Sequence, residues 1–172
     1  MGATSKARNI LVLANTFIVT TCSTLLIPHA NAQPPGFPDL RQFKEVDAAQ
    51  FSRPFSYPER WANVYSFFRT PDGLNCAIGP SSWCNGDIPG LPSSRDRVCA
   101  SVHQEGDDQR FVFDSDNTKC DPTHDKLLVS GQKLTDPLTG TGCVVGEGRL
   151  TACINAQGDR GFVLQPSGSW VF

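Results

Sequence analysis

Hydrophobic positions fall into one long run near the start of the chain and into many short runs after residue 63. The long run extends from Ile10 to Ile27, covers 18 residues and holds no charged residue. The later runs are much shorter and contain many Val and Phe residues. The long run has the length of an export or membrane segment, whereas short runs of β-branched and aromatic residues are typical of strands.

Short strands with turn sequences between them are predicted for residues 61–172. Thr70-Pro71-Asp72-Gly73 is a turn, because proline fixes φ at its second position and glycine accepts positive φ after it. Strands are expected at residues 64–69, 74–78, 97–102, 110–113, 127–129, 162–164 and 169–172. This spacing predicts a mainly β, antiparallel hairpin domain, and it leaves open a sandwich, a half-barrel or a meander.

Residues 143–154 predict a hairpin of defined register. If Cys143 faces Cys153, then Val144 faces Ala152, and the loop tip is Glu147-Gly148-Arg149. The apolar side chains of both strands then share one face, and both cysteines share the other. One register therefore satisfies an apolar face and a cross-strand disulfide together.

A Pro-rich arm occupies residues 33–60. Proline removes a backbone donor, so the two ends of the arm are unsuited to regular elements. Between them, Asp39 can cap one short helix over residues 40–49. Alternatively the arm is extended and lays its apolar side chains onto the domain. These side chains are Phe37, Leu40, Phe43, Phe51 and Phe55.

Residues 1–32 match a secretory signal peptide. Lys6 and Arg8 form a short positive region, the apolar run follows, and Pro28-His29-Ala30-Asn31-Ala32 supplies an Ala-x-Ala cleavage site. Cleavage after Ala32 starts the mature chain at Gln33. Six polar residues within the run make a permanent membrane span a poor alternative. A lipoprotein signal at Cys22 is disfavoured, because the apolar run continues past that cysteine.

The charge of the chain excludes one class of partner. The 172 residues include 15 Lys and Arg and 17 Asp and Glu. Without the signal, 13 basic and 17 acidic residues remain, so the mature chain has a net charge of −4. Such a chain has no electrostatic basis for binding nucleic acid. We expect a secreted protein, extracellular or associated with the cell envelope, with no transmembrane span after cleavage.

Six cysteines remain after the signal, and an even number in an exported chain predicts three disulfides. The preferred pairing is sequential, with Cys76–Cys99 as the runner-up for the first region. The sequential pairs are Cys76–Cys84, Cys99–Cys120 and Cys143–Cys153. The absence of a Cys-x-x-Cys spacing argues against both a zinc site and a redox-active disulfide. The expected role of the disulfides is structural, and no metal or cofactor is implied.

Two segments around these cysteines share a short pattern. Residues 73–79 and 140–146 both read Gly-x-x-Cys-x-[Ile/Val]-Gly, and a second cysteine follows the first after 8 and 10 residues respectively. The match fits two related hairpins, each closed by its own disulfide, and it also fits chance, because repeats usually show longer self-similarity.

The segment from Phe68 to Gly79, which reads FRTPDGLNCAIG, resembles a pattern in uncharacterised exported proteins of mycobacteria and related actinobacteria. The resemblance extends over most of the mature chain. It includes residues 37–40, residues 131–134, the Cys143/Cys153 hairpin and Gly161-Phe162. It implies a small disulfide-bonded exported domain, with Cys99 and Cys120 as additions to a four-cysteine pattern. It implies no activity and no site residues.

Catalytic motifs are incomplete, and no residue is assigned a catalytic role. Ser130-Gly131-Gln132-Lys133 and Ser115-Asp116-Asn117 resemble parts of penicillin-recognising enzymes, but their order is reversed and Lys-Thr-Gly is missing. Asp114 to Asn117 carries calcium-like oxygens without the glycine and glutamate of an EF-hand loop, so a polar turn is favoured. His103 and His124 are expected in solvent-facing loops.

Trp83 is the strongest candidate for a ligand contact. It precedes Cys84 and is expected in a short loop, where tryptophan can stack on a sugar ring or anchor a partner. The favoured alternative is that Trp83 shields the disulfide and packs on the core, because small exported domains bury aromatic residues to enlarge thin cores.

Two function classes follow from these features. The first is a non-enzymatic binding or structural module of the cell envelope or extracellular space, whose partner is an envelope component or another protein. The second is a small extracytoplasmic hydrolase of envelope polymers that uses acids such as Asp107, Asp108, Asp114 and Asp116. A pocket with converging acids favours the hydrolase, and a packed β core with shallow loops favours the binding module.

Overall fold

Two sheets contain all the strands in the described part of the chain. The computed structural model describes residue 2 and residues 33–52, 65–91, 99–106, 110–116, 120 and 122–172. The expected signal peptide therefore lies outside the described residues, apart from Gly2. The only helical turns in the described ranges are two 3-10 turns, η1 (Leu40–Gln42) and η2 (Ala48–Gln50).

The five-stranded sheet is an antiparallel meander in which every strand pairs with the next along the chain. Its order is β2-β3-β4-β5-β6. The strands are β2 (Ser66–Arg69), β3 (Asn75–Ile78), β4 (Trp83–Gly86), β5 (Cys99–Glu105) and β6 (Arg110–Asp116).

The six-stranded sheet is a second meander with one strand of the arm added at its edge. Its order is β1-β7-β8-β9-β10-β11, and β1 runs parallel to β7 while the other pairs are antiparallel. The strands are β1 (Lys44–Glu45), β7 (Gln132–Thr135), β8 (Gly142–Val145), β9 (Thr151–Ile154), β10 (Gly161–Leu164) and β11 (Trp170–Val171).

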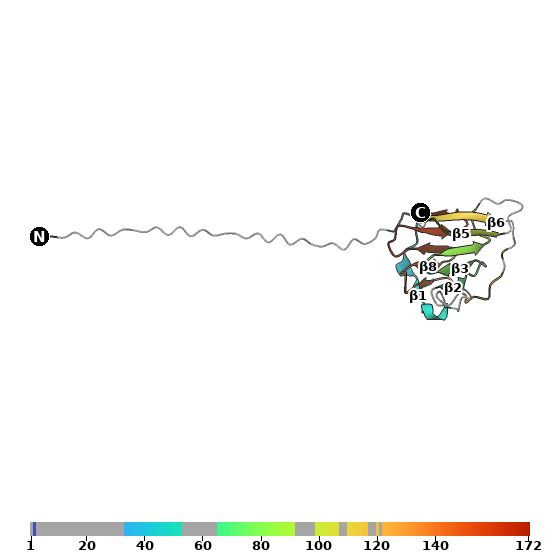
Figure 1. Ribbon diagram of the computed structural model, residues 1–172, viewed down its shortest axis with the longest axis horizontal. Coiled ribbons are helices and arrows are strands. Elements are labelled where there is room, and N and C mark those ends of the chain that lie inside the picture. The colour runs from blue at the N-terminus through green and yellow to red at the C-terminus, as the bar shows by residue number, and fades with distance from the viewer. Residues whose placement is uncertain are drawn as a thin grey trace.

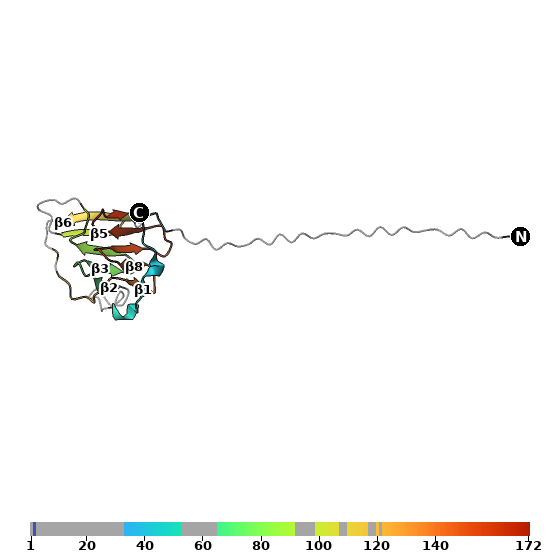
Figure 2. The ribbon, with the colours of Figure 1, turned by 180° about the vertical axis from the view of Figure 1, so that it is seen from behind.

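The two sheets pack face to face as a β-sandwich (Figure 1; Figure 2 shows the reverse side). One cluster of buried side chains draws on both sheets, and the rings of Phe111 in β6 and Phe162 in β10 meet edge to face with centroids 5.2 Å apart. The predicted mainly β, antiparallel architecture is confirmed, and of the three forms left open the structure has the sandwich.

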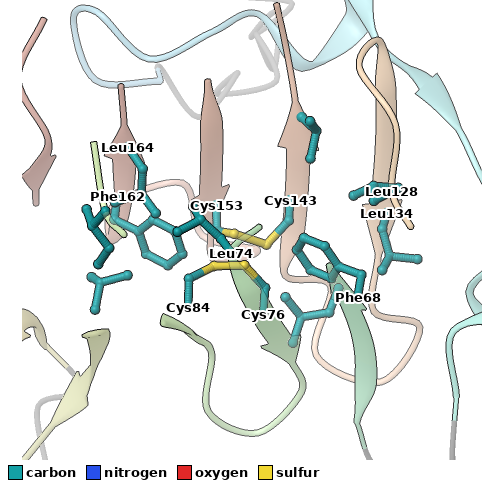
Figure 3. Packing of buried hydrophobic residues seen from close by; sticks show 14 of the residues in the cluster. Phe68, Leu74, Cys76, Cys84, Leu128, Leu134, Cys143, Cys153, Phe162 and Leu164 are labelled. Atoms are coloured by element: carbon teal, nitrogen blue, oxygen red, sulfur yellow. A yellow bond between two sulfur atoms is a disulfide. The ribbon is translucent and has the colours of Figure 1, made fainter. Parts of the chain in front are cut away.

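Strand alternation places two disulfides against each other in this core. The Cys76–Cys84 bond joins β3 to β4, and the Cys143–Cys153 bond joins β8 to β9. Figure 3 shows the two bonds facing each other from the opposing sheets, with Phe68 on one side and Phe162 on the other. All four cysteines are at most 1% exposed.

The disulfide pairing is the sequential one, so the Cys76–Cys99 alternative is not formed. The third bond, Cys99–Cys120, has a Cα–Cα distance of 5.0 Å and both of its cysteines are half-buried. The hairpin over residues 143–154 also has its predicted register, with Cys143 opposite Cys153 and Val144 opposite Ala152.

The arm follows the extended alternative over residues 33–52, and no helix forms over 40–49. Asp39 does cap a turn, since its side chain accepts a hydrogen bond from the Arg41 N–H, but the turn is only η1. The chain then leaves the helical path because the N–H groups of Lys44 and Val46 donate to carbonyls beside and within β7. Phe55 lies outside the described residues.

The apolar side chains of the arm cover the outer face of the six-stranded sheet. A second buried cluster contains Phe37, Val144, Ala152, Ile154 and Val163, with further apolar side chains of the arm and the last strand packed against it. Phe37 also meets the ring of the last residue, Phe172, edge to face at 5.7 Å. This outer face is therefore closed by the chain itself.

The strand expectations need correction at residues 127–129 and at three strands for which the sequence gives no prediction. Residues 127–129 form only an isolated parallel bridge between Leu127 and Arg69, because this segment runs along the edge of β2. The sequence predicts no strand at β1, β4 or β7. Trp83 is accordingly the first residue of β4 and does not lie in a loop.

Candidate functional site

The outer face of the five-stranded sheet carries Trp83. Successive side chains of a strand point to opposite faces, so Trp83 points away from the core into which Cys84 points. Neither buried cluster contains Trp83. The interpretation that Trp83 shields the disulfide and packs on the core is therefore wrong, and its side chain is half-buried on the opposite surface.

An apolar and aromatic row crosses this face through Trp83. The register places Trp83 opposite Ala77 on one side and opposite His103 on the other. The full row across the five strands is Phe67, Ala77, Trp83, His103 and Val112. Phe67 and Ala77 are buried, whereas the other three side chains are half-buried. His103 thus lies within β5 and not in the loop expected for it.

A polar row runs beside the aromatic row. Each of its members lies two residues from a member of the aromatic row and on the same face of the sheet. The register aligns these residues across the five strands as Arg69, Asn75, Asn85, Ser101 and Asp114. The stretch from Asn75 to Asp114 crosses three inter-strand spacings, or about 14 Å. A band of amide, hydroxyl and carboxylate groups therefore lies next to the indole, perpendicular to the strands. The two rows together are named the Trp83 face below.

Several polar groups of the Trp83 face are not fully used by the protein. Ser101 Oγ and His103 Nδ1 lie 3.3 Å apart, and Asp114 Oδ1 accepts a hydrogen bond from the Ser115 N–H at 2.7 Å. Asn85 Oδ1 is shut off from solvent and has no hydrogen-bond partner in the described structure. Nor does any described residue accept a hydrogen bond from the indole N–H of Trp83. The hydroxyl, carboxylate and indole N–H groups therefore retain hydrogen-bonding capacity for a ligand, whereas the Asn85 oxygen is buried and would need its amide to rotate.

A groove lies between the arm and the six-stranded sheet, but its charged and amide side chains pair with other groups of the protein. The groove has a volume of about 580 Å³ and is lined by residues that include Arg41, Lys133 and Asn155. Lys133 Nζ lies 2.8 Å from Glu45 Oε2. The side chain of Asn155 closes its own turn by accepting from the backbone N–H groups of residues 158–160.

Asp39 and Arg41, which also line this groove, pair with each other. Arg41 donates to both carboxylate oxygens of Asp39 at 2.9 Å. These side-chain hydrogen bonds lower the pKa of Asp39 and raise the pKa of Arg41. A ligand would have to break such pairs, so the groove is the weaker binding candidate.

The acids named for a hydrolase are not assembled by the described residues. Asp107 and Asp108 lie outside them, as does the side chain of Asp116, and Asp114 is exposed on β6. Two other acids, Asp72 and Asp87, are joined by Arg149, which lies 3.3 Å from each carboxylate. In the ranges that the structure describes, no group of three or more His, Cys, Asp and Glu side chains could hold a metal ion.

The serine and lysine of the Ser-x-x-Lys motif have separate structural roles. Ser130 Oγ donates to the Gly146 carbonyl at 3.0 Å, and Lys133 forms its ion pair with Glu45. The two side chains are engaged with different partners, so they do not form a nucleophile and base. His124 is exposed among residues 122–126, in the loop where it was expected.

No family model, curated protein or solved structure matches this chain. No helix among the described residues is long and apolar enough to cross a membrane. The three disulfides are compatible with an oxidising extracellular environment. What the geometry offers chemically is a sheet surface with an aromatic ring and hydrogen-bonding groups on one rigid support.

Proposed function

We propose that the protein is an exported, non-enzymatic binding module of the cell envelope or extracellular space, and that it binds through the Trp83 face. The observation that carries the proposal is the position of Trp83 on the outside of a disulfide-bonded sheet, beside a row of polar side chains. A tryptophan with no role in either core cluster is available for contact with a partner.

The shape of the molecule favours binding over hydrolysis. The space between the sheets is filled by packed apolar side chains and two disulfides, and the Trp83 face consists of side chains on the outer surface of a sheet. A glycosidase needs two carboxyl groups placed across a cleft. On the Trp83 face, the described side chains include one carboxylate, that of Asp114.

Export is part of the proposal and has its own test. The disulfides, the signal-like residues 1–32 and the resemblance to exported actinobacterial proteins support it. Expression in an actinobacterial host should yield a protein whose first residue is Gln33, in the medium or released from the envelope without detergent. Recovery of a diacylated Cys22 peptide from membranes would replace this proposal with a lipoprotein.

The binding role is tested with Trp83→Ala and a matched surface control. Purified envelope polymers and envelope proteins are incubated with the wild type, with Trp83→Ala and with Leu138→Ala, which removes a 69% exposed apolar side chain far from the face in sequence. We expect Trp83→Ala to weaken retention about tenfold or more, since aromatic anchors dominate binding energy. Leu138→Ala should bind as the wild type, and all three should have similar circular dichroism. Equal retention of all three proteins would contradict the proposal.

A further inference from the structure

We infer that the ligand of the Trp83 face is an uncharged glycan chain lying across the strands, with one sugar ring on the Trp83 indole. This inference rests on the proposed function and names the ligand class. It is carried by the juxtaposition of the aromatic row with the polar row, which the strand register fixes.

The indole and its neighbours match the two kinds of surface that a sugar ring presents. A pyranose ring has an apolar face of C–H groups and a rim of hydroxyls. The indole plane is apolar with a polar edge, and the Trp83 N–H is unused by the described residues. Asn85 lies two residues along the same strand, and Ser101 lies opposite Asn85 on β5. A ring on the indole therefore has hydrogen-bonding groups beside its rim.

The polar groups suit hydroxyls because most of them both donate and accept. Asparagine offers an amide N–H₂ and a carbonyl oxygen, serine offers a hydroxyl, and neutral histidine has one donor and one acceptor nitrogen. Asn75, Asn85, Ser101 and His103 are all of these types. Sugar hydroxyls also donate and accept hydrogen bonds, so a hydroxyl can pair with a side chain of these types. No charge is left unpaired by such a pairing.

The unpaired oxygen of Asn85 is a second observation that points to a ligand. A buried acceptor without a partner costs about 1–3 kcal/mol, and this oxygen has no partner in the described structure. Rotation of the amide toward the outer surface would pair it with a ligand hydroxyl. The face thus contains an acceptor whose hydrogen bond is missing in the protein alone.

The charges of the face select an uncharged glycan over an anionic one. Within the two rows the only cation is Arg69 at the end of the polar row, and the Arg69 Nε already donates to the Asp125 carbonyl at 3.1 Å. At the other end Asp114 is exposed and negative. Beyond the aromatic row on the same side of the sheet, Arg110 lies opposite the carboxylate-bearing Glu105. An anionic polymer would meet a carboxylate without a compensating cluster of cations.

The direction of the rows argues against an extended peptide as the occupant. A peptide strand binds by adding backbone hydrogen bonds to a sheet edge, whereas this surface offers side chains from the middle of a sheet. The rows run across the strands for about 14 Å between Asn75 and Asp114, which is long enough for a short oligosaccharide. The opposite sheet has no equivalent surface, because the arm covers it.

Affinity electrophoresis of the full mature protein in gels that contain a soluble neutral polysaccharide tests the inference. Separate gels contain a glucan, a mannan, a galactan or the anionic polymer polygalacturonate. We expect retardation by a neutral polysaccharide, no change in that retardation between low and high salt, and none by polygalacturonate. Trp83→Ala should lose about tenfold in affinity or more, Trp83→Phe should retain part of it, and Asn85→Ala and Ser101→Ala should each weaken it severalfold.

Controls separate the failure of this inference from the failure of the proposed function. Leu138→Ala should be retarded as the wild type. If no neutral polysaccharide retards the wild type, or if polygalacturonate alone does so with loss at high salt, the glycan inference is overturned. If Trp83→Ala also retains full binding to envelope polymers and proteins, the proposed function fails with it. If Trp83→Ala lowers binding only to an envelope protein, the binding function stands and the glycan is wrong.

Discussion

Two glycines flank Ile154 in the six-stranded sheet, and the space around them differs. β9 pairs Ile154 with Gly161 on one side and with Gly142 on the other. A Cβ on Gly161 would lie 2.2 Å from the Cys153 carbonyl oxygen and 2.7 Å from a ring carbon of Phe172. A Cβ on Gly142 would meet its nearest neighbours at 3.9 Å, an ordinary contact. Neither glycine has a positive φ, so the two positions differ only in the room that they leave for a Cβ atom.

Alanine at these two positions should therefore have different effects on stability. Gly161→Ala forces strand backbone to move, and we expect it to lower the free energy of unfolding by about 2–3 kcal/mol. Gly142→Ala should change it by less than about 1 kcal/mol, with a gain allowed because alanine restricts the unfolded chain. Urea unfolding followed by circular dichroism measures both. Equal losses at the two positions would show that strand geometry, not the carbonyl contact, sets the cost.

At the scale of elements, local sequence signals predict hairpins better than they predict which strands distant in the chain pair with each other. The Cys143–Cys153 hairpin is predictable because one register satisfies the disulfide and the apolar pattern at once. β4 reads Trp83-Cys84-Asn85-Gly86, a strand of four residues in which asparagine and glycine weaken the strand signal. β7 contains the polar residues Gln132 and Lys133, and β1 pairs with these two residues at the edge of the sheet. The sequence marks Trp83 as a candidate contact residue, but only its strand and register show which way it points.

The arm shows why pairing over long distances escapes local reasoning. The residues from Asp39 to Ala49 fit a helix or an extended strand, and the choice depends on the free edge of β7, some 90 residues later in the chain. Once β1 occupies that edge, Phe37 and Phe43 come to lie on the sheet's outer face. The arm thus protects an edge and a hydrophobic surface together.

Shortening Phe37 should expose this surface. Phe37 is 8% exposed and contacts Phe172, so Phe37→Ala removes a mostly buried ring from the second cluster. We expect a loss of about 2–4 kcal/mol in the free energy of unfolding and increased binding of the dye ANS. Leu138→Ala, on an exposed side chain, is the control and should change stability by less than about 0.5 kcal/mol. A stable Phe37→Ala protein without added dye binding would mean that the arm does not shield the sheet.

At the scale of the whole molecule, the two sheets are built on the same plan. In the five-stranded sheet Phe68, Cys76, Cys84 and Val102 form one row on the core side. The corresponding row of the six-stranded sheet is Leu134, Cys143, Cys153 and Phe162. The short sequence pattern shared by residues 73–79 and 140–146 therefore marks two hairpins in matching places, each closed by its own disulfide. The match in position supports the interpretation of two related hairpins.

Each of these disulfides joins neighbouring strands of one sheet, so the sandwich itself is held by packing between the sheets. Buried apolar side chains such as Phe68, Phe111 and Phe162 provide most of this contact. Arg149 adds a surface link from the β8–β9 loop to Asp72 and Asp87, and exposed ion pairs of this kind contribute about 0–1 kcal/mol. Opening the sandwich is consequently the step that exposes the central disulfides.

The three disulfides should therefore be reduced in a fixed order. Cys99 and Cys120 are half-buried, while Cys84 and Cys143 are 0% exposed. Mild reductant without denaturant should first open Cys99–Cys120, a cross-link over 21 residues whose loss costs about 3 kcal/mol in the chain-entropy account. The two central bonds should open only at the rate of global unfolding. Timed alkylation with peptide mass mapping, followed by circular dichroism, gives the order. Reduction of Cys76–Cys84 in a protein that keeps Cys99–Cys120 would contradict it, because a thiolate must reach the sulfur it attacks.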